Sequence, residues 1–468
     1  MKDFFRAFLS FGLATSIQKL LGFIILPIYT LYFNTEEYGI IDMTSTVIAV
    51  VSIFGLLQLE TALQRYYYEW TGIKRKLLIS NIYMWIGGLS LLIAILLFIF
   101  APLISFKLYD TSEYGYLIRI ASIQLPLNNF SMLGLVLLRF KKENLKFLKV
   151  IIVNVISSLL FVYLFVINLQ LGLNGVFYAQ LLAVFLSTSL VTFYIRKDII
   201  FRRSKPITKR NFKYALPQFP ARIGSVLLAQ ANRFFMLGFL SLSAIGIYSV
   251  SMKLASSIQL VNTAFILAWA PFMNAQFKNK NNKVIFANAL PLIAGVTFLF
   301  VCLITLYSKE MVHLLASEDF YDSSKYVGGL ALFYSLYIIK ETVDIGPKIS
   351  EKTKYLSITF FLSVVVNISA LYFLIQNYEI VGVVLAMIIT NLFLVTISWF
   401  ISNRLYYIPY NLFLFIILLS PALILSISAM FIELSLTFRL LISVLCIVLY
   451  STLLLKSYKT FKELNIKL

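Results

Sequence analysis

The chain is dominated by apolar runs of about 20 residues, which recur along nearly all of its 468 residues. A helix rises ~1.5 Å per residue, so a run of this length crosses a hydrocarbon core ~30 Å thick. Inside lipid, every backbone amide must be paired within the protein, and a helix achieves this within one segment. Transmembrane β-barrels show short alternating segments instead, and the sequence lacks them. The runs therefore predict an all-α integral membrane protein.

About fourteen runs are long enough to be spans, and only 13% of the residues are charged. The first run begins near Leu9 and continues without a small-residue cleavage site, so it is predicted to be a span rather than a signal peptide. The predicted spans are 9–32, 40–63, 78–101, 116–138, 150–168, 173–195, 214–240, 245–272, 284–307, 326–346, 355–375, 380–402, 411–432 and 438–455.

Basic residues are concentrated in every second loop, as the positive-inside rule requires of cytoplasmic loops. With the N-terminus inside, thirty of the 40 Lys and Arg residues fall in inside loops and tails, and four fall in outside loops. The central inside loop, 196–213, holds eight basic residues against one acid, Asp198. Both termini are therefore predicted to be cytoplasmic. Because topology accounts for the net charge of +20, no nucleic-acid partner is predicted.

The chain also looks duplicated, because a shift of 207 residues superposes landmarks of its two halves. Lys141 falls on Lys348, and Gly175 falls on Gly382. Six spans is an even number, so both halves enter the membrane from the same side, as in transporters with parallel repeats. The predicted parts are an N-terminal six-helix lobe (1–195), a basic cytoplasmic linker (196–213), a C-terminal six-helix lobe (214–403), and two extra transmembrane helices with a tail (404–468).

Ten charged residues remain inside the predicted spans. An ionised group at mid-membrane costs at least ~2.5–3.5 kcal/mol on insertion scales, so these groups should face a wet cavity or one another. Those near span ends can instead snorkel to the interface. Lys19 and Arg233 lie deep, and Arg222 and Lys253 lie at intermediate depth. The shallower candidates for cavity or gate charges are Asp42, Glu60, Arg119, Lys340, Glu341 and Asp344, of which Lys340 and Glu341 can also pair with partners elsewhere.

Three spans carry a polar stripe that includes a cation at helical spacing. The stripes are Thr15, Ser16 and Lys19; Arg222, Ser225, Ala229 and Arg233; and Ser249, Lys253, Ser256 and Ser257. Small polar residues can serve as contacts between helices, but that role does not explain six cations against four acids. A lumen with this excess attracts an anion. Arginine matches phosphate oxygens with paired donors, and lysine adds a mobile point charge.

No metal site, disulfide or cofactor is predicted. Cys302 and Cys446 both lie inside apolar runs and lack the spacing of metal ligands. The lone histidine, His313, lies in a charged loop near Glu310 and Glu318 and is expected to be solvated. No catalytic residue is predicted.

Several short motifs resemble a known family. They are Pro27, Glu37-Tyr38-Gly39, Arg65-Tyr66-Tyr67, Leu216-Pro217, Arg233-Phe234, Gly246-Ile247-Tyr248-Ser249 running on to Lys253, Trp269-Ala270-Pro271-Phe272 and Glu351-Lys352-Thr353. With the 6 + 6 repeat, they make the chain similar to the polysaccharide (O-antigen type) flippases of the multidrug/oligosaccharidyl-lipid/polysaccharide exporter superfamily, relatives of the lipid II flippase. The resemblance covers essentially the whole chain.

The resemblance implies two six-helix lobes around a central cavity, with two further C-terminal helices. The implied activity moves an undecaprenyl-diphosphate-linked oligosaccharide, such as an O-antigen repeat unit, from the inner to the outer leaflet of the bacterial cytoplasmic membrane. Lys19, Arg222, Arg233 and Lys253 would then bind its diphosphate and sugars. Further implied partners are membrane lipids, a polysaccharide polymerase and the chain-length machinery. One departure is Asn232, where relatives often have Asp, which removes an expected partner of Arg233.

The hypothesis is transport by alternating access, not enzyme catalysis. Energy coupling through protons or sodium is conceivable at Asp42, Glu60 or Asp344, and no motif selects among them. A drug or metabolite exporter of the same superfamily is the main alternative, although a net-positive cavity serves organic cations poorly. A membrane-embedded polymerase or ligase would usually have a large outer loop, and the longest here, 309–325, is short. A channel would be expected to show a filter motif, which the sequence lacks.

Overall fold

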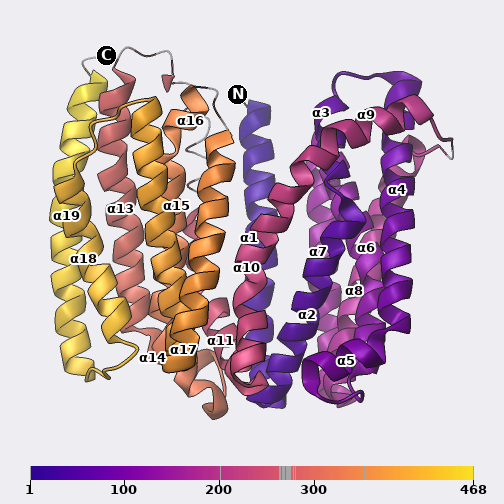
Figure 1. Cartoon of the computed structure of the whole chain (residues 1–468), viewed down its shortest axis with the longest axis horizontal. Coiled ribbons are helices and arrows are strands. Elements are labelled where there is room, and N and C mark those ends of the chain that lie inside the picture. Colours follow the sequence, from indigo (N-terminus) through magenta and orange to yellow (C-terminus); the bar gives the residue numbers. More distant parts are fainter. Residues whose placement is uncertain are drawn as a thin grey trace. The chain divides into compact units, whose positions relative to one another are not determined.

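The structure, a computed structural model, describes residues 2–466 except positions 201, 263, 264, 266–268, 270–272, 274, 275, 278, 280, 351 and 353, and it describes side chains within 17–459. Every regular element over the described residues is helical (Figure 1), which confirms the predicted all-α class. The chain divides into two compact units, unit 1, Met1–Arg233, and unit 2, Phe234–Leu468. The bounds of the lobes and linker stay a prediction.

Unit 1 is built from long helices joined by short turns. In chain order these are α1 (Lys2–Tyr32), α2 (Thr35–Leu56), α3 (Leu59–Tyr66), α4 (Gly72–Ile99), α5 (Ala101–Tyr109), α6 (Gly115–Phe140), α7 (Asn144–Val162), a π-helical turn (Tyr163–Asn168), α8 (Gly172–Ile195), a 3-10 turn (Arg196–Asp198), α9 (Lys205–Ala215), a second 3-10 turn (Leu216–Gln218) and α10 (Phe219–Phe239), whose last residues belong to unit 2.

The second predicted span, 40–63, contains a break that its apolar run does not reveal. Leu57 and Gln58 have positive φ angles of 43° and 58°, and they separate α2 from α3. At the start of α2, Asn34 accepts from the Glu37 backbone N–H, and the Glu37 carboxylate accepts from the Asn34 N–H. This reciprocal cap satisfies two free donors of the helix end. Glu37, one of the motif residues, is thus explained by helix capping.

Unit 2 has the same helical character. Its helices after α10 are α11 (Leu242–Ala255), α13 (Asn282–Leu306), α14 (Ser308–Leu315), a 3-10 segment (Glu318–Ser323), α15 (Ser324–Val343), α16 (Ile345–Ile349), α17 (Lys354–Leu405), α18 (Leu412–Ser428) and α19 (Leu436–Ile466). The predicted outer loop 309–325 contains most of α14 and a 3-10 segment. The motif positions Ala270, Pro271, Phe272, Glu351 and Thr353 lie outside the described residues.

The two C-terminal helices, α18 and α19, pack on α13. The Tyr450 hydroxyl on α19 donates to the Leu418 carbonyl on α18 at 2.6 Å and lies 3.8 Å from Cys302 Sγ on α13. Cys302 and Cys446 are both buried free thiols. The predicted extra spans are therefore integral to the packing of unit 2.

Within the described residues, eight helices are long and apolar enough to cross a membrane. Three shorter apolar helices are Ile17–Tyr32, Leu242–Ala255 and Leu412–Ser428. One of the eight, α17, contains two predicted spans that meet at Glu379, where the backbone is not helical. The protein is thus a multi-pass membrane protein, and the count of fourteen spans stays a prediction.

The repeat offset brings two glycines into matching local environments. A Cβ on Gly175 would lie 2.7 Å from the carbonyl oxygen of Phe165, and a Cβ on Gly382 would lie 2.5 Å from the carbonyl carbon of Leu374. Only a residue without a side chain allows such a close approach. Each glycine thus packs a helix against the end of the preceding span.

Glu379 is a site where a substitution should stabilise the protein. Its φ of 48° and ψ of −127° are disfavoured for a residue with a Cβ. At the corresponding position of the first half, 207 residues earlier, Gly172 has a φ of 56°. We expect Glu379→Gly to raise the free energy of unfolding by about 1 kcal/mol, because it removes backbone strain. Denaturation in mixed micelles would measure it, and a loss of stability would contradict the expectation.

Candidate functional site

Unit 1 contains a cavity of about 580 Å³. It is open on one side and lined by residues of α1, α2, α6, α7, α8 and α10, so six helices of one unit contribute to its wall. Its volume falls within the ~300–1,000 Å³ typical of small-molecule sites. The amide and hydroxyl side chains on the wall, apart from Gln18 on α1, are Ser52, Asn128, Asn129, Ser131, Asn154 and Ser187.

Close helix packing holds these polar side chains in place. The Asn129 amide donates to Ser90 Oγ at 2.8 Å and to the Ser52 carbonyl at 3.3 Å. Gly55 makes room for this contact, because a Cβ there would lie 2.7 Å from the Asn129 amide nitrogen. On the other side, Asn154 donates to Ser187 Oγ at 3.2 Å. The wall therefore presents fixed amides and hydroxyls.

Two arginines lie on the same wall, Arg139 from the last turn of α6 and Arg222 from α10. Among the described residues, neither guanidinium has an acidic partner within 4 Å or a hydrogen-bond acceptor. Arg222 is half-buried and Arg139 is exposed. A cavity with two arginines that form no ion pair within 4 Å among the described residues, together with several fixed amides, suits an anion that also carries hydroxyl groups.

Arg233, predicted to be a deep ligand of the substrate, is paired in the structure. Its guanidinium makes a close ion pair with Asp42 on α2, with a second contact of 3.4 Å, and it donates to Gln230 at 3.2 Å. Asn232 gives Arg233 no acid at the neighbouring position. The acid that pairs with Arg233 is Asp42, 191 positions away in the sequence.

The other candidates are distributed over separate places. Lys19 is half-buried on α1. Glu60 on α3 is 5% exposed, and its Oε2 has no hydrogen-bond partner among the described residues. Arg119 lies exposed with its guanidinium over the Phe98 ring at 5.4 Å, away from the cavity wall. Lys253 belongs to α11 of unit 2. Their roles as substrate or gate residues stay predictions.

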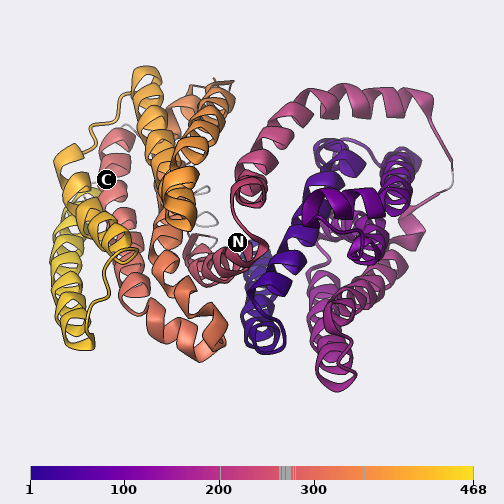
Figure 2. The same ribbon diagram turned by 60° about the horizontal axis from the view of Figure 1, so that its bottom comes forward.

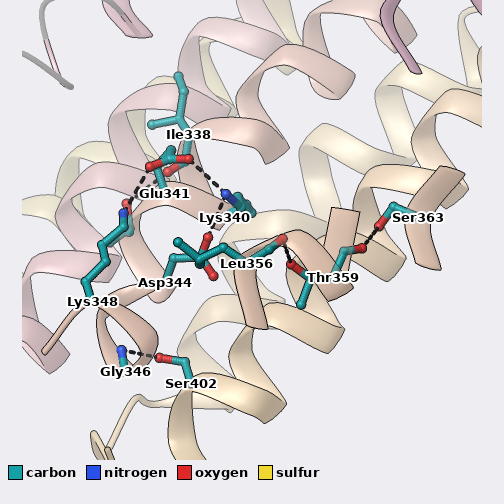
Figure 3. A network of polar contacts seen from close by, with 11 residues as sticks. Ile338, Lys340, Glu341, Asp344, Gly346, Lys348, Leu356, Thr359, Ser363 and Ser402 are labelled. Atoms are coloured by element: carbon teal, nitrogen blue, oxygen red, sulfur yellow. Dashed lines mark hydrogen bonds and ion pairs between the residues drawn. The ribbon is translucent and has the colours of Figure 1, made fainter. Parts of the chain in front are cut away.

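Lys340, Glu341 and Asp344 form a charge network at the end of α15 (Figure 3). Lys340 Nζ lies 2.9 Å from Glu341 Oε1 and 2.6 Å from Asp344 Oδ2, and Lys348 Nζ lies 3.1 Å from Glu341 Oε2. The contact with Asp344 is close but poorly aligned for a hydrogen bond, so its attraction is mainly electrostatic. Lys340 and Glu341 therefore pair with each other and with Asp344 and Lys348, which are close in the sequence.

This network is buried and electrically balanced. The side chains of Lys340 and Asp344 are 3% and 1% exposed. The Phe360 ring of α17 covers Lys340 at 4.6 Å. Two ammonium groups face two carboxylates, so the cluster presents no net charge to an anion. We therefore separate it from the cavity of unit 1 and regard it as a stabilising network.

The cavity includes residues that the search for charges in the sequence overlooked. Asn128, Asn129 and Asn154 interrupt apolar runs but carry no charge. Arg139 falls in a predicted inside loop, yet it reaches the cavity from the end of α6. The available signal was the adjacent pair Asn128-Asn129 two residues after Pro126, since consecutive amides within a membrane span are costly without partners.

The family model described as "Polysaccharide biosynthesis protein" matches residues 32–325, which is more than half of the chain. The chain belongs to this family. No curated protein sequence matches it.

Solved structures show the same fold. Lipid II flippase MurJ in an inward closed conformation is 17% identical, with a TM-score of 0.73 over 96% of this chain and 99% of that one. An inward-facing multidrug resistance MATE family transporter of the MOP superfamily is 14% identical, with a TM-score of 0.66 over 84% and 97%. The Vibrio cholerae MATE transporter VcmN is 14% identical, with a TM-score of 0.57 over 86% and 96%.

Proposed function

We propose that the protein moves a polyprenyl-diphosphate-linked oligosaccharide, a repeat unit of a surface polysaccharide such as O-antigen, from the inner to the outer leaflet of the bacterial cytoplasmic membrane. Membership of the polysaccharide biosynthesis family supports this class of substrate. The observation that carries the proposal is the cavity of unit 1, where Arg139 and Arg222, which form no ion pair among the described residues, lie beside fixed amides. The lipid II flippase, whose fold the chain shares, acts on a lipid-linked molecule.

The chemistry of this substrate matches the wall of the cavity. A diphosphate offers several anionic oxygens, which arginine guanidinium groups bind with paired hydrogen bonds. Sugar hydroxyls both donate and accept, as do amide and hydroxyl side chains. The polyprenyl chain is apolar and stays in the bilayer while the polar part crosses. Binding the polar part in a membrane-embedded cavity removes the main cost of its transfer through lipid.

Transport requires the site to open to one side and then to the other, so we propose alternating access. In this scheme the substrate diphosphate competes with Asp42 for Arg233, and proton or sodium binding at Asp42 would favour the exchange. The Asp42–Arg233 ion pair supports this step, because it joins α2 to α10 through opposite charges that another ion can replace. Termini on the cytoplasmic side follow from the distribution of basic loops.

Arg222→Ala tests the proposal in a strain lacking the chromosomal gene. We expect surface polysaccharide to fall about 10- to 100-fold, the loss that corresponds to one charged hydrogen bond of ~1.5–3 kcal/mol. Arg222→Lys should retain part of the output. Arg119→Ala is the matched control, because Arg119 is exposed and absent from the cavity wall. Normal polysaccharide in the Arg222→Ala strain, at equal protein level, would exclude the proposed role of the cavity.

The alternative is an exporter of drugs or metabolites, which the shared fold with multidrug transporters favours. The charge of the cavity supports the lipid-linked diphosphate over a cationic drug. Cationic drugs would be repelled by Arg139 and Arg222, whereas a diphosphate would be attracted. A deletion strain that becomes drug-sensitive while its surface polysaccharide stays normal would favour the exporter.

A further inference from the structure

The segment between α8 and α10 forms a helix, α9, that packs across α3 and α4 (Figures 1 and 2). The Ile200 N–H donates to Ser80 Oγ at 2.7 Å, and Thr208 Oγ1 donates to Asn81 Oδ1 at 3.0 Å. Arg210 pairs with Glu69 at 2.6 Å and lies over the Tyr66 ring at 4.5 Å. Specific contacts thus hold one face of α9, and the residues just before it, against α3 and α4.

The opposite face of α9 carries unneutralised positive charge. Lys205, Lys209 and Lys213 are spaced by four residues, so they lie on one side of the helix. Arg202 and Arg203 precede them, and all five side chains are exposed. Among the described residues, none of the five has an ion pair, while the sole acid of the segment, Asp198, binds Lys141 at 2.7 Å. We call these five residues the α9 strip.

The α9 strip has an energetic cost that its own helix does not offset. Like charges four residues apart destabilise a helix by ~0.2–0.5 kcal/mol per pair. Arg210 shows how a basic residue in α9 serves the fold, since it has an acid and an aromatic partner. The α9 strip lacks such partners among the described residues, so its charge is available to an external anion.

The contacts of α9 place it at the membrane surface. Phe212 packs edge-on against Trp85 of α4, with ring centroids 5.1 Å apart. Trp85 lies nine residues beyond Lys76, the last residue of the basic cluster that opens α4, and 39% of its surface is exposed. Nine residues are roughly 13 Å along a helix, and side chains of a helix lean toward its N-terminus, so Trp85 can meet a helix that lies at the basic end of α4. An amphipathic helix at this level lies among lipid headgroups.

We infer that the α9 strip binds the anionic headgroups of phospholipids in the inner leaflet. The charge of the strip, its regular spacing and its level beside Trp85 together favour a lipid over a soluble acidic partner. Each basic residue near an anionic membrane surface contributes ~1 kcal/mol, which is about fivefold in affinity. The inference is independent of the proposed transport function.

Trp85 gives a local probe of the lipid next to α9. The full chain with Trp70, Trp269 and Trp399 replaced by Phe is reconstituted in phosphatidylcholine containing dibrominated phosphatidylglycerol or dibrominated phosphatidylcholine. Bromine quenches a nearby tryptophan, so the ratio of quenching gives the relative affinity of the two lipids at this site. We expect phosphatidylglycerol to be favoured at least fivefold at low ionic strength, and less so at high salt.

Charge-neutralising variants decide whether the strip is responsible. Lys205→Gln, Lys209→Gln and Lys213→Gln together should bring the ratio close to one, and the three Lys→Arg changes should preserve it. The matched control removes three exposed basic residues of other predicted inside loops that lie outside the elements packed against α9, Lys142→Gln, Lys149→Gln and Lys352→Gln, and should leave the ratio unchanged. A ratio near one in the parent, or an unchanged ratio in the Gln variant, would overturn the inference. Dependence of surface polysaccharide on the strip without lipid preference would indicate an acidic protein partner instead.

Discussion

Replacing Lys340 with Met should lower the free energy of unfolding by about 3–5 kcal/mol, the cost of leaving a buried ion pair with one charge unmatched. Lys340 Nζ is the group that faces both Glu341 and Asp344. Asp344 is 1% exposed, so water cannot replace the lost ammonium. Met has similar length and fills the space beside Phe360, which limits the effect of packing. Denaturation of the purified protein in mixed micelles would measure the change.

The double variant Lys340→Met with Asp344→Leu separates charge from shape. Removing both partners removes the unmatched charge, and such replacements are often neutral or stabilising. We therefore expect the double variant to recover most of the stability lost in Lys340→Met. Glu341 keeps its contact with Lys348 at 3.1 Å in both variants. A double variant as unstable as the single one would show that packing, rather than charge, supports this region.

The fold class could be predicted from sequence because the membrane restricts the choices. In an apolar run of about 20 residues, a helix satisfies the backbone N–H and C=O groups within one segment. The structure is helical over the described residues. The interruptions were harder to predict. Leu57 and Gln58 adopt positive φ although neither is glycine, the residue that usually takes this conformation. The sequence likewise predicts only a basic linker at 196–213, where the structure has the helix α9.

The pairing of charges could be predicted only in part. Asp42 and Arg233 are both among the charged residues inside predicted spans, but their contact depends on tertiary packing between α2 and α10. The pair formed by Lys340 and Asp344 follows helical spacing of four residues, so the sequence already contained its signal. The cavity of unit 1 was missed because its wall consists mostly of uncharged amides and hydroxyls, and a search restricted to charges passes over them.

Gly346→Ala should be the most damaging single-methyl addition near this network. Gly346, the second residue of α16, approaches α17 closely, and its N–H donates to Ser402 Oγ at 2.8 Å. An added Cβ would overlap the Ser402 carbonyl oxygen and lie 2.7 Å from Ser402 Cα. Backbone atoms of a packed helix cannot move aside cheaply, so we expect a loss of about 3 kcal/mol in the free energy of unfolding.

Gly88→Ala on α4 is the control for the helical preference of alanine. A Cβ at Gly88 meets no atom within 4 Å, so the change adds helix propensity without a clash. We expect it to be neutral or to stabilise by up to ~1 kcal/mol. Denaturation of both variants in the same micelles compares them directly. If Gly346→Ala proved as stable as Gly88→Ala, α16 would not be held against Ser402 as the structure has it. The turn from α15 into α16, which contains Asp344, would then lack this contact with α17.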